Sequence, residues 1–179
     1  MTRGGPKRIL ALDLARRTGW ACCGERDDAG PPLHGCWKLP GLLAETIDAA
    51  HSQLFDLVQA MIRQHRIEVL VVEALNQGTV SRPGMGLAHR ALPTVACLAA
   101  VRLGVKRYEV ATSTWRKHFL GRGDLGGTEA KMRAVTLCCQ LGPGWACTDH
   151  NEAEAQGIYA YAKSILQPGW AYRSTPLFA

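Results

Sequence analysis

The sequence has no apolar run long enough to cross a membrane, because every apolar stretch falls short of the roughly 18 residues that a spanning helix needs. The first eight residues are polar and only a short apolar run follows them, so we expect no signal peptide. Internal repeats and low-complexity segments are also missing. These absences predict a single cytoplasmic domain over residues 1–179, with a basic N-terminal leader and an irregular tail after Pro168.

The seven cysteines form no zinc-binding pattern. Their number is odd, two pairs are adjacent in the sequence, and the spacing CxxC does not occur. Most of them lie in apolar segments, where a free thiol packs like a small core side chain. We therefore expect reduced cysteines in a reducing compartment.

Negative charge is in the minority, since 15 Asp and Glu residues stand against 21 Lys and Arg residues, for a net charge of +6. The basic residues recur in short clusters, at 7–8, 16–17, 106–107 and 116–118. Such a balance favours a polyanionic partner, but it also suits a merely soluble basic surface. Buried acids in a chain that is basic elsewhere favour the first interpretation, because nucleases need carboxylates for metal and cations for phosphate.

The chain does contain a single acid inside each of two apolar runs, 9–15 and 69–75. Runs of this length and β-branched content are typical of strands in a sheet covered on both faces, where an ionised carboxylate must be paired or bind a metal. Asp13 and Glu73 fall near the carboxyl ends of these strands, the edge where ligands bind in open α/β sheets. Two carboxylates there would repel each other unless a cation lay between them, so the pattern predicts a cation site.

A third acidic cluster opens the last predicted helix, in the segment 149–155. His150 and Glu154 are four residues apart and Asn151 and Glu154 are three apart, so each pair shares one helix face. If this helix packs beside the two strands, Glu154 with His150 or Asn151 completes an oxygen-rich pocket for Mg²⁺ or Mn²⁺.

Each acid also has a purely structural interpretation. Asp13 could bond a loop, and Glu73 could pair with a buried arginine. Asp149, or the preceding Thr148, would serve as a helix cap, and Glu152 would lie on a solvated helix surface. The sequence leaves these alternatives open.

Hydrophobic periodicity predicts an α/β protein. Strands are expected at 8–15, 18–24, 33–39, 69–75 and 105–110, and helices at 42–66, 87–103, 131–141 and 151–166. The three early strands in succession predict an antiparallel meander. This order of elements is that of the ribonuclease H-like architecture, a mixed five-stranded sheet with helices on both faces, although periodicity alone does not choose the topology.

Four segments resemble the RuvC-like Holliday junction resolvases, especially their phage and prophage members. They are ILALDLARRTGWA at 9–21, VLVVEAL at 69–75, TSTWRKHFLG at 112–121 and DHNEAEAQGIYAYA at 149–162. The resemblance covers nearly the whole chain and implies a ribonuclease H-like fold. In that family four acidic positions hold two divalent ions, and Asp13, Glu73 and Glu154 match three of them.

The fourth position of the resemblance falls on His150 or Asn151, and Asp149 is the nearest acid. Some family members carry a histidine there, so His150 is expected as a fourth ligand or as a proton-transfer group. Glu154 stands where the family more often has an aspartate, and its longer side chain would shift a bound metal by roughly one ångström.

The resemblance implies a metal-dependent endonuclease that resolves four-way DNA junctions as a homodimer, cutting two strands symmetrically with two Mg²⁺ or Mn²⁺ ions in each active site. Two alternatives stay open at this point. The same fold would serve a ribonuclease H-type or flap nuclease, and a chain that had lost its fourth ligand would bind junctions without cutting them. A nucleotide-binding kinase or chaperone is disfavoured, because those proteins need paired domains that this length does not provide.

Basic side chains predict the DNA-binding surface. The expected DNA contacts are Arg16, Arg82, Arg90, Arg116, Lys117, Arg122 and Lys131. The stretch 76–90 follows the Glu73 strand as a strand-guiding loop would, and it also carries His89. The resolvases that it resembles often place an aromatic wedge there, but this stretch has none, so Met85, Leu87 or another element would open the junction.

The segment 121–126 matches the pattern GxGxxG literally but follows no clean strand, so we interpret it as a mobile basic loop that leads to Lys131. Trp115 is expected mainly to pack in the core, with Arg116 and Lys117 beside it contacting phosphate. The small-residue helix 88–103 would suit either a dimer contact or packing within the chain.

Overall fold

The computed structural model of the chain describes residues 7–24, 30–41, 46–74 and 86–167, except for the side chains of 86–89. Its strands are β1 (Ile9–Asp13), β2 (Arg17–Cys22), β3 (Leu33–Lys38), β4 (Val69–Glu73) and β5 (Lys106–Val110). Its helices are α1 (Ile47–His65), α2 (Gly86–Val101), α3 (Thr112–Leu120), α4 (Gly127–Leu141) and α5 (His150–Leu166). The predicted tail and most of the predicted leader lie outside the described residues.

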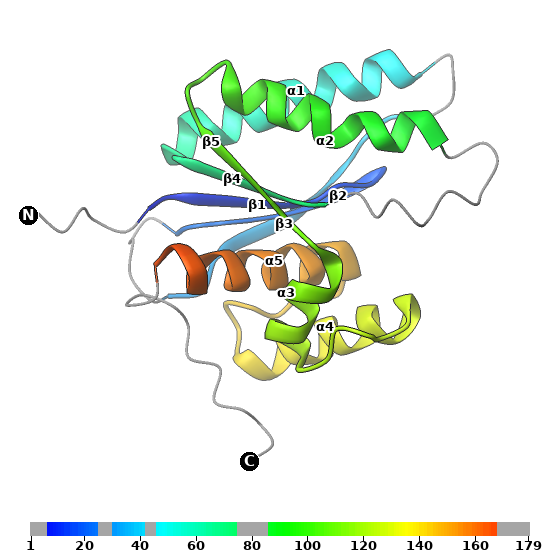
Figure 1. Cartoon of the computed structure of the whole chain (residues 1–179), viewed down its shortest axis with the longest axis vertical. Helices are drawn as coiled ribbons and strands as arrows, with labels where there is room; N and C mark the ends of the chain where they lie inside the picture. The colour runs from blue at the N-terminus through cyan, green and yellow to red at the C-terminus, as the bar shows by residue number, and fades with distance from the viewer. Residues whose placement is uncertain (1–6, 25–29, 42–45, 75–85, 168–179) are drawn as a thin grey trace, which may run out of the picture.

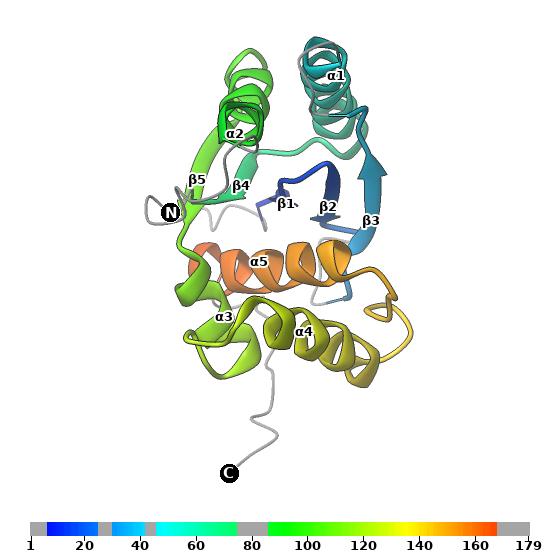
Figure 2. The same ribbon diagram turned by 90° about the vertical axis from the view of Figure 1, so that its right-hand side faces the viewer.

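The strands form one sheet in the order β3-β2-β1-β4-β5. β1, β2 and β3 pair antiparallel, whereas β4 is parallel to β1 and β5 is parallel to β4. α1 and α2 cover one face of this sheet, and α5 covers the other with α3 and α4 behind it (Figures 1 and 2). The predicted meander, the mixed five-stranded sheet and the helices on both faces are therefore confirmed.

Alternation along the central strand divides the interior between these two layers. Leu10 and Leu12 of β1 belong to the core under α1 and α2, whereas Ile9 and Ala11 belong to the core under α5. Asp13 follows Ile9 and Ala11 in this alternation. The first predicted acid therefore lies on the α5 face of the sheet.

α5 is buried between the sheet and the two outer helices, and ten of its 17 residues are buried. Two glycines permit this close packing. A Cβ atom on Gly19 in β2 would lie 1.9 Å from the carbonyl oxygen of Asn151, and one on Gly157 would lie 2.8 Å from the rings of Trp115 and Phe119. Because Gly19 is the partner of Asp13 in the β1–β2 register, the first turn of α5 rests directly beside the end of β1.

The sequence prediction missed α3 entirely. Only Trp115 and Phe119 are buried among its nine residues, so this short polar segment gives little helical periodicity. α4 begins at Gly127, four residues before its predicted start, because its first three residues are exposed and carry no apolar signal. The other predicted elements are confirmed, with ends that shift by a few residues.

The described cysteines are free, and five of the seven are buried, as expected for thiols that pack as small apolar side chains. The small residues of α2 likewise face the core, since Ala96, Ala99 and Ala100 are fully buried. This confirms that the small residues of α2 pack within the chain. Its outward side instead carries Leu98 and Val101, which are 54% and 58% exposed.

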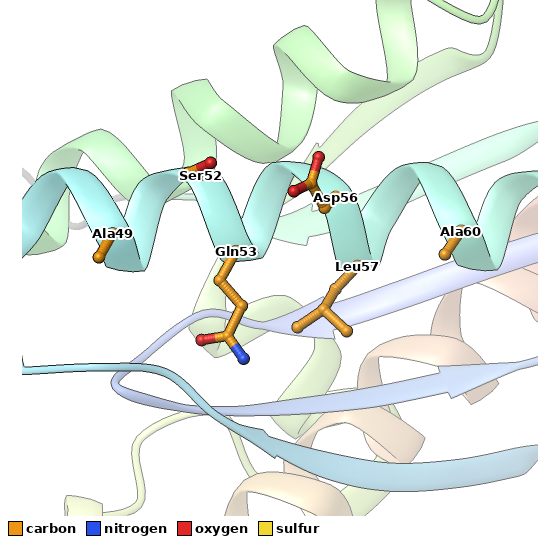
Figure 3. Close-up of a pocket in the computed structure, with 6 residues that line it drawn as sticks. All are labelled: Ala49, Ser52, Gln53, Asp56, Leu57 and Ala60. Carbon is orange, nitrogen blue, oxygen red and sulfur yellow. The ribbon is translucent and has the colours of Figure 1, made fainter.

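An open hollow of about 530 Å³ runs along one side of α1 (Figure 3). It is lined by Ala49, Ser52, Gln53, Asp56, Leu57 and Ala60. Because α1 and α5 cover opposite faces of the sheet, this hollow belongs to the layer that does not contain the predicted acids (Figure 2). No helix within the described stretches is long and apolar enough to cross a membrane.

Candidate active site

The carboxyl ends of β1 and β4 bring Asp13 and Glu73 side by side. The two strands are parallel and pair Leu12 with Val72, so the acids occupy the next position of each strand. Both residues are half-buried. Their predicted position at one edge of the sheet is confirmed, and their role as metal ligands stays a prediction.

Glu154 reaches the same place from α5, which packs on β1 and β2. Its residue is 4% exposed, and burial raises the pKa of its carboxyl. Burial also raises the pKa of Asp13 well above its usual range, and the charges of Glu154 and Glu73 raise it further. The three carboxylates therefore act on one another across a single site.

A half-buried cation is already paired with this cluster. Arg116 of α3 donates from Nη2 to Oε1 of Glu154 over 2.9 Å, and the two side chains are 14% and 5% exposed. Burial raises the pKa of Glu154, and the Arg116 charge and hydrogen bond oppose that rise. One interpretation of the sequence was that Glu73 pairs with a buried arginine. In the structure Arg116 pairs with Glu154 instead.

Two more side chains act on the acids. Lys131 of α4 is half-buried, and its charge lowers the pKa of Asp13 and of Glu154 against the larger effect of burial. Thr112, the first residue of α3, donates its hydroxyl group to Oε1 of Glu73. The site thus contains groups that favour the ionised carboxylates as well as groups that oppose them.

Asp149 caps α5. Its Oδ1 accepts hydrogen bonds from the backbone amides of Asn151 and Glu152, at 2.9 and 3.4 Å, and its Oδ2 lies 2.5 Å from Nη2 of Arg17. Although burial alone would raise the pKa of Asp149, these hydrogen bonds hold it below its usual value. The capping alternative is confirmed, and both carboxylate oxygens are engaged by protein donors.

His150 opens α5 and lies four residues before Glu154, which places both on one side of the helix. Burial lowers the pKa of its imidazole, and the Lys131 charge lowers it further. The neutral imidazole that results at neutral pH is the form that binds a metal or accepts a proton. Asn151, the other candidate for the fourth position, is 6% exposed.

The predicted environment of Glu152 is wrong. Its side chain is only 17% exposed, and its Oε1 lies 2.5 Å from Nδ1 of His34 in β3. The other ring nitrogen of His34 lies 3.2 Å from the carbonyl oxygen of Gly144. This contact ties the first turn of α5 to the edge strand, so Glu152 is not a solvated surface residue.

The donors of the site fit a hard divalent cation in their chemistry. Asp13, Glu73 and Glu154 offer carboxylate oxygens, and their mutual repulsion is what a cation would relieve. In the part of the chain that the structure describes, no three His, Cys, Asp or Glu side chains form a ready metal cluster. A cation bound by all three acids would therefore compete with Arg116 for Glu154.

The predicted DNA contacts divide into three groups. Arg16, Arg90, Lys117 and Arg122 are exposed, Arg116 and Lys131 are half-buried near the acids, and Arg82 lies outside the described residues. Arg122 also pairs with Asp124 over 2.9 Å. Among the described candidates, the four exposed side chains therefore form the accessible part of the predicted surface.

Trp115 is fully buried, which confirms its predicted role in the core, and the Arg116 guanidinium lies 5.4 Å from its ring centroid. Met85 and the side chains of Leu87 and His89 lie outside the described residues, so the expected junction-opening residue has no structural account.

Sequence reasoning did not single out Arg17, His34 or Thr112. The partners of Arg17 and His34 are 132 and 118 residues away in the chain, so no local spacing could reveal them. Thr112 stands four residues before Arg116, and this helical spacing is a usable signal only once α3 is known.

The strand order, the acids at the ends of two adjacent parallel strands and the helix packed across them define a ribonuclease H-like fold. Solved structures specify this fold further. RuvC from Thermus thermophilus superimposes with a TM-score of 0.69 at 15% identity, over 92% of this chain and 98% of that chain, both in its own structure and in complex with a Holliday junction substrate.

The yeast mitochondrial Holliday junction resolvase Ydc2 is a more distant structural match. It superimposes with a TM-score of 0.54 at 8% identity, over 86% of this chain and 76% of that chain. No family model and no curated protein matches the sequence. The chain therefore has a RuvC-like fold, as its sequence segments predict, at an identity where likeness establishes the fold alone.

Proposed function

We propose that the protein is a divalent-cation-dependent endonuclease that resolves four-way DNA junctions. The observation that carries the proposal is the meeting of Asp13, Glu73 and Glu154 at one edge of a RuvC-like sheet. A structural neighbour in complex with a Holliday junction substrate supports the choice of DNA. Carboxylate oxygens of this kind suit Mg²⁺ or Mn²⁺.

Asp13, Glu73 and Glu154 would hold the cations, with His150 as a fourth ligand or proton-transfer group. Asp149 would join them only by exchanging its bond to Arg17. When bound, two divalent ions activate a water for in-line attack and stabilise the leaving oxygen. The contribution of the chain is to fix the carboxylates on rigid elements, two at strand ends and one on a buried helix.

Arg116 and Lys131 supply positive charge beside those carboxylates. They favour the ionised forms of Asp13 and Glu154, which burial disfavours. The same charges would favour an incoming phosphate, because charge–charge interactions strengthen where water is excluded. The exposed cations Arg16, Lys117 and Arg122 would then contact the DNA backbone further from the scissile bond.

Symmetric cutting of two strands requires two active sites, which a homodimer supplies. The outward side of α2 offers a contact surface, since Leu98 and Val101 are among the most exposed large apolar side chains in the described part of the chain. Exposed apolar stripes of this kind favour burial against a partner. We propose that a second copy of the chain covers this stripe.

The proposal is tested by incubating a labelled four-way DNA junction with the protein and Mg²⁺ or Mn²⁺, with linear duplex and RNA–DNA hybrid as competitors. We expect paired, symmetric nicks in the wild type. Asp13→Asn should reduce cutting to background and leave junction binding intact, because it removes a ligand without disturbing the exposed cations.

Two results would contradict the proposal. Tight junction binding without cutting in either metal would identify a non-catalytic binding module, in agreement with the absence of a ready metal cluster among the described residues. Preferential cutting of the hybrid would assign the protein to a ribonuclease H-type activity instead.

A further inference from the structure

α3 begins immediately beside the acid-bearing strands. β5 runs parallel to β4, with Val110 opposite Glu73, and the chain enters α3 two residues after Val110. The backbone amide of Ala74 also donates to the carbonyl oxygen of Val110 over 2.8 Å. Thr112 therefore stands next to Glu73 because the register of two parallel strands carries it there.

The Thr112 hydroxyl donates to Oε1 of Glu73, the last residue of β4. Ala111 occupies the N-cap position of α3, so Thr112 is the first helical residue. From this position its hydroxyl group is directed at a carboxylate of the candidate active site.

A hydrogen-bond donor beside the Glu73 carboxylate matters because two other carboxylates lie close to it. Its charge raises the pKa of both Asp13 and Glu154, so the Glu73 carboxylate lies in the field of two other acids. A hydrogen bond to one oxygen restricts rotation of a carboxylate that its neighbours repel. Outer hydrogen bonds of this kind orient ligands in metal sites, and losing one commonly weakens metal binding about 10-fold to 100-fold.

The donor is held firmly by its helix. Trp115 is fully buried, and its ring packs against Gly157 of α5 so closely that a Cβ atom there would lie 2.8 Å away. Arg116, four residues after Thr112, binds Glu154. One short helix thus contacts two of the three carboxylates, from two positions on one of its sides.

We propose that Thr112 is a positioning residue that orients Glu73 for divalent-cation binding. The inference rests on the proposed function, because it assumes that Glu73 is a ligand. It predicts that removing the hydroxyl group weakens binding of the cation, whereas serine, which keeps the hydroxyl, restores binding.

The experiment is a Mn²⁺ titration followed by electron paramagnetic resonance, which counts free Mn²⁺ directly and needs no turnover. The variants are Thr112→Val, Thr112→Ser and the matched control Thr114→Val, which makes the same change at an exposed position of α3. We expect Thr112→Val to raise the Mn²⁺ dissociation constant about 10-fold and the serine and control variants to match the wild type. The Mn²⁺ concentration that gives half-maximal junction cutting should rise by the same factor, with junction affinity unchanged.

Thermal unfolding of each variant distinguishes lost positioning from lost folding, and Thr112→Ala provides a second hydroxyl-free variant. Equal Mn²⁺ affinity for Thr112→Val and Thr114→Val would overturn the role of Thr112 while leaving the proposed function standing. A wild type that neither binds Mn²⁺ nor cuts junctions would overturn both.

Discussion

The two faces of the sheet use the same strands for different purposes. Under α1 and α2, the side chains of β1 and β4 are Leu10, Leu12, Leu70 and Val72, all buried in one apolar core. Under α5, the alternate residues end in Asp13 and Glu73, beside cations supplied by α3 and α4. Successive residues of one strand therefore have different roles, because their side chains enter different layers. One side chain stabilises the fold, and the next contributes to the candidate site.

The largest expected effect comes from the α5 layer, with Arg116→Met. The change leaves Glu154 buried without its cation, and breaking a buried pair from one side costs about 3 kcal/mol or more. Burial already raises the pKa of Glu154, and loss of Arg116 should raise it further. Because cutting needs the ionised carboxylate, the acidic limb of the rate–pH profile should move to higher pH.

The free energy of unfolding of Arg116→Met should also depend on pH. A carboxyl whose pKa is raised in the folded state binds more protons there than in the unfolded state, so stability falls as pH rises through the raised pKa. We therefore expect the deficit of Arg116→Met to be greatest above that pH, in denaturation curves measured across the range. Lys117→Met is the control for stability, because Lys117 is exposed on the same helix. An unchanged rate–pH profile in Arg116→Met would contradict the prediction.

The second effect comes from the opposite layer, with Leu12→Ala. Leu12 is fully buried and adjacent to Asp13, so the cavity should lower the free energy of unfolding by about 2–5 kcal/mol. Cutting per folded molecule should persist, because the removed atoms face away from the acids. Denaturation together with single-turnover cleavage measures both quantities, and Leu12→Met keeps the volume as a control. Loss of cutting at full folding would show that the two layers are not separable.

The smallest effect on a single subunit is expected from Leu98→Glu on the exposed side of α2. Charge on the apolar stripe should weaken the proposed dimer without destabilising the fold, because Leu98 is 54% exposed. Sedimentation measures the association, and junction cutting should lose its symmetry. Met132→Glu places the same charge on another exposed apolar position, in α4, and should change neither. Dimers that survive in Leu98→Glu would place the contact elsewhere.

The sequence predicted what depends on local pattern. Continuous apolar runs predicted β1 and β4, and the single acid in each run marked the edge where Asp13 and Glu73 meet. It could not reveal that Arg17 bonds Asp149 or that Arg116 bonds Glu154, because these partners are brought together only by tertiary packing. α3 escaped detection for a related reason: its two buried side chains are too few to produce a helical period.

The geometry of the candidate active site depends on Gly19, which lies where β2 and α5 come closest. Only hydrogen atoms separate the backbone of β2 from the first turn of α5 at this point, and Gly19 is the register partner of Asp13. A methyl group there would act as a wedge between β2, which pairs with the strand that carries Asp13, and the helix that carries Glu154. Misplacement by about one ångström can cost a reaction of this type a factor of about a hundred. The geometry of the proposed catalytic site thus depends on a residue that has no side chain.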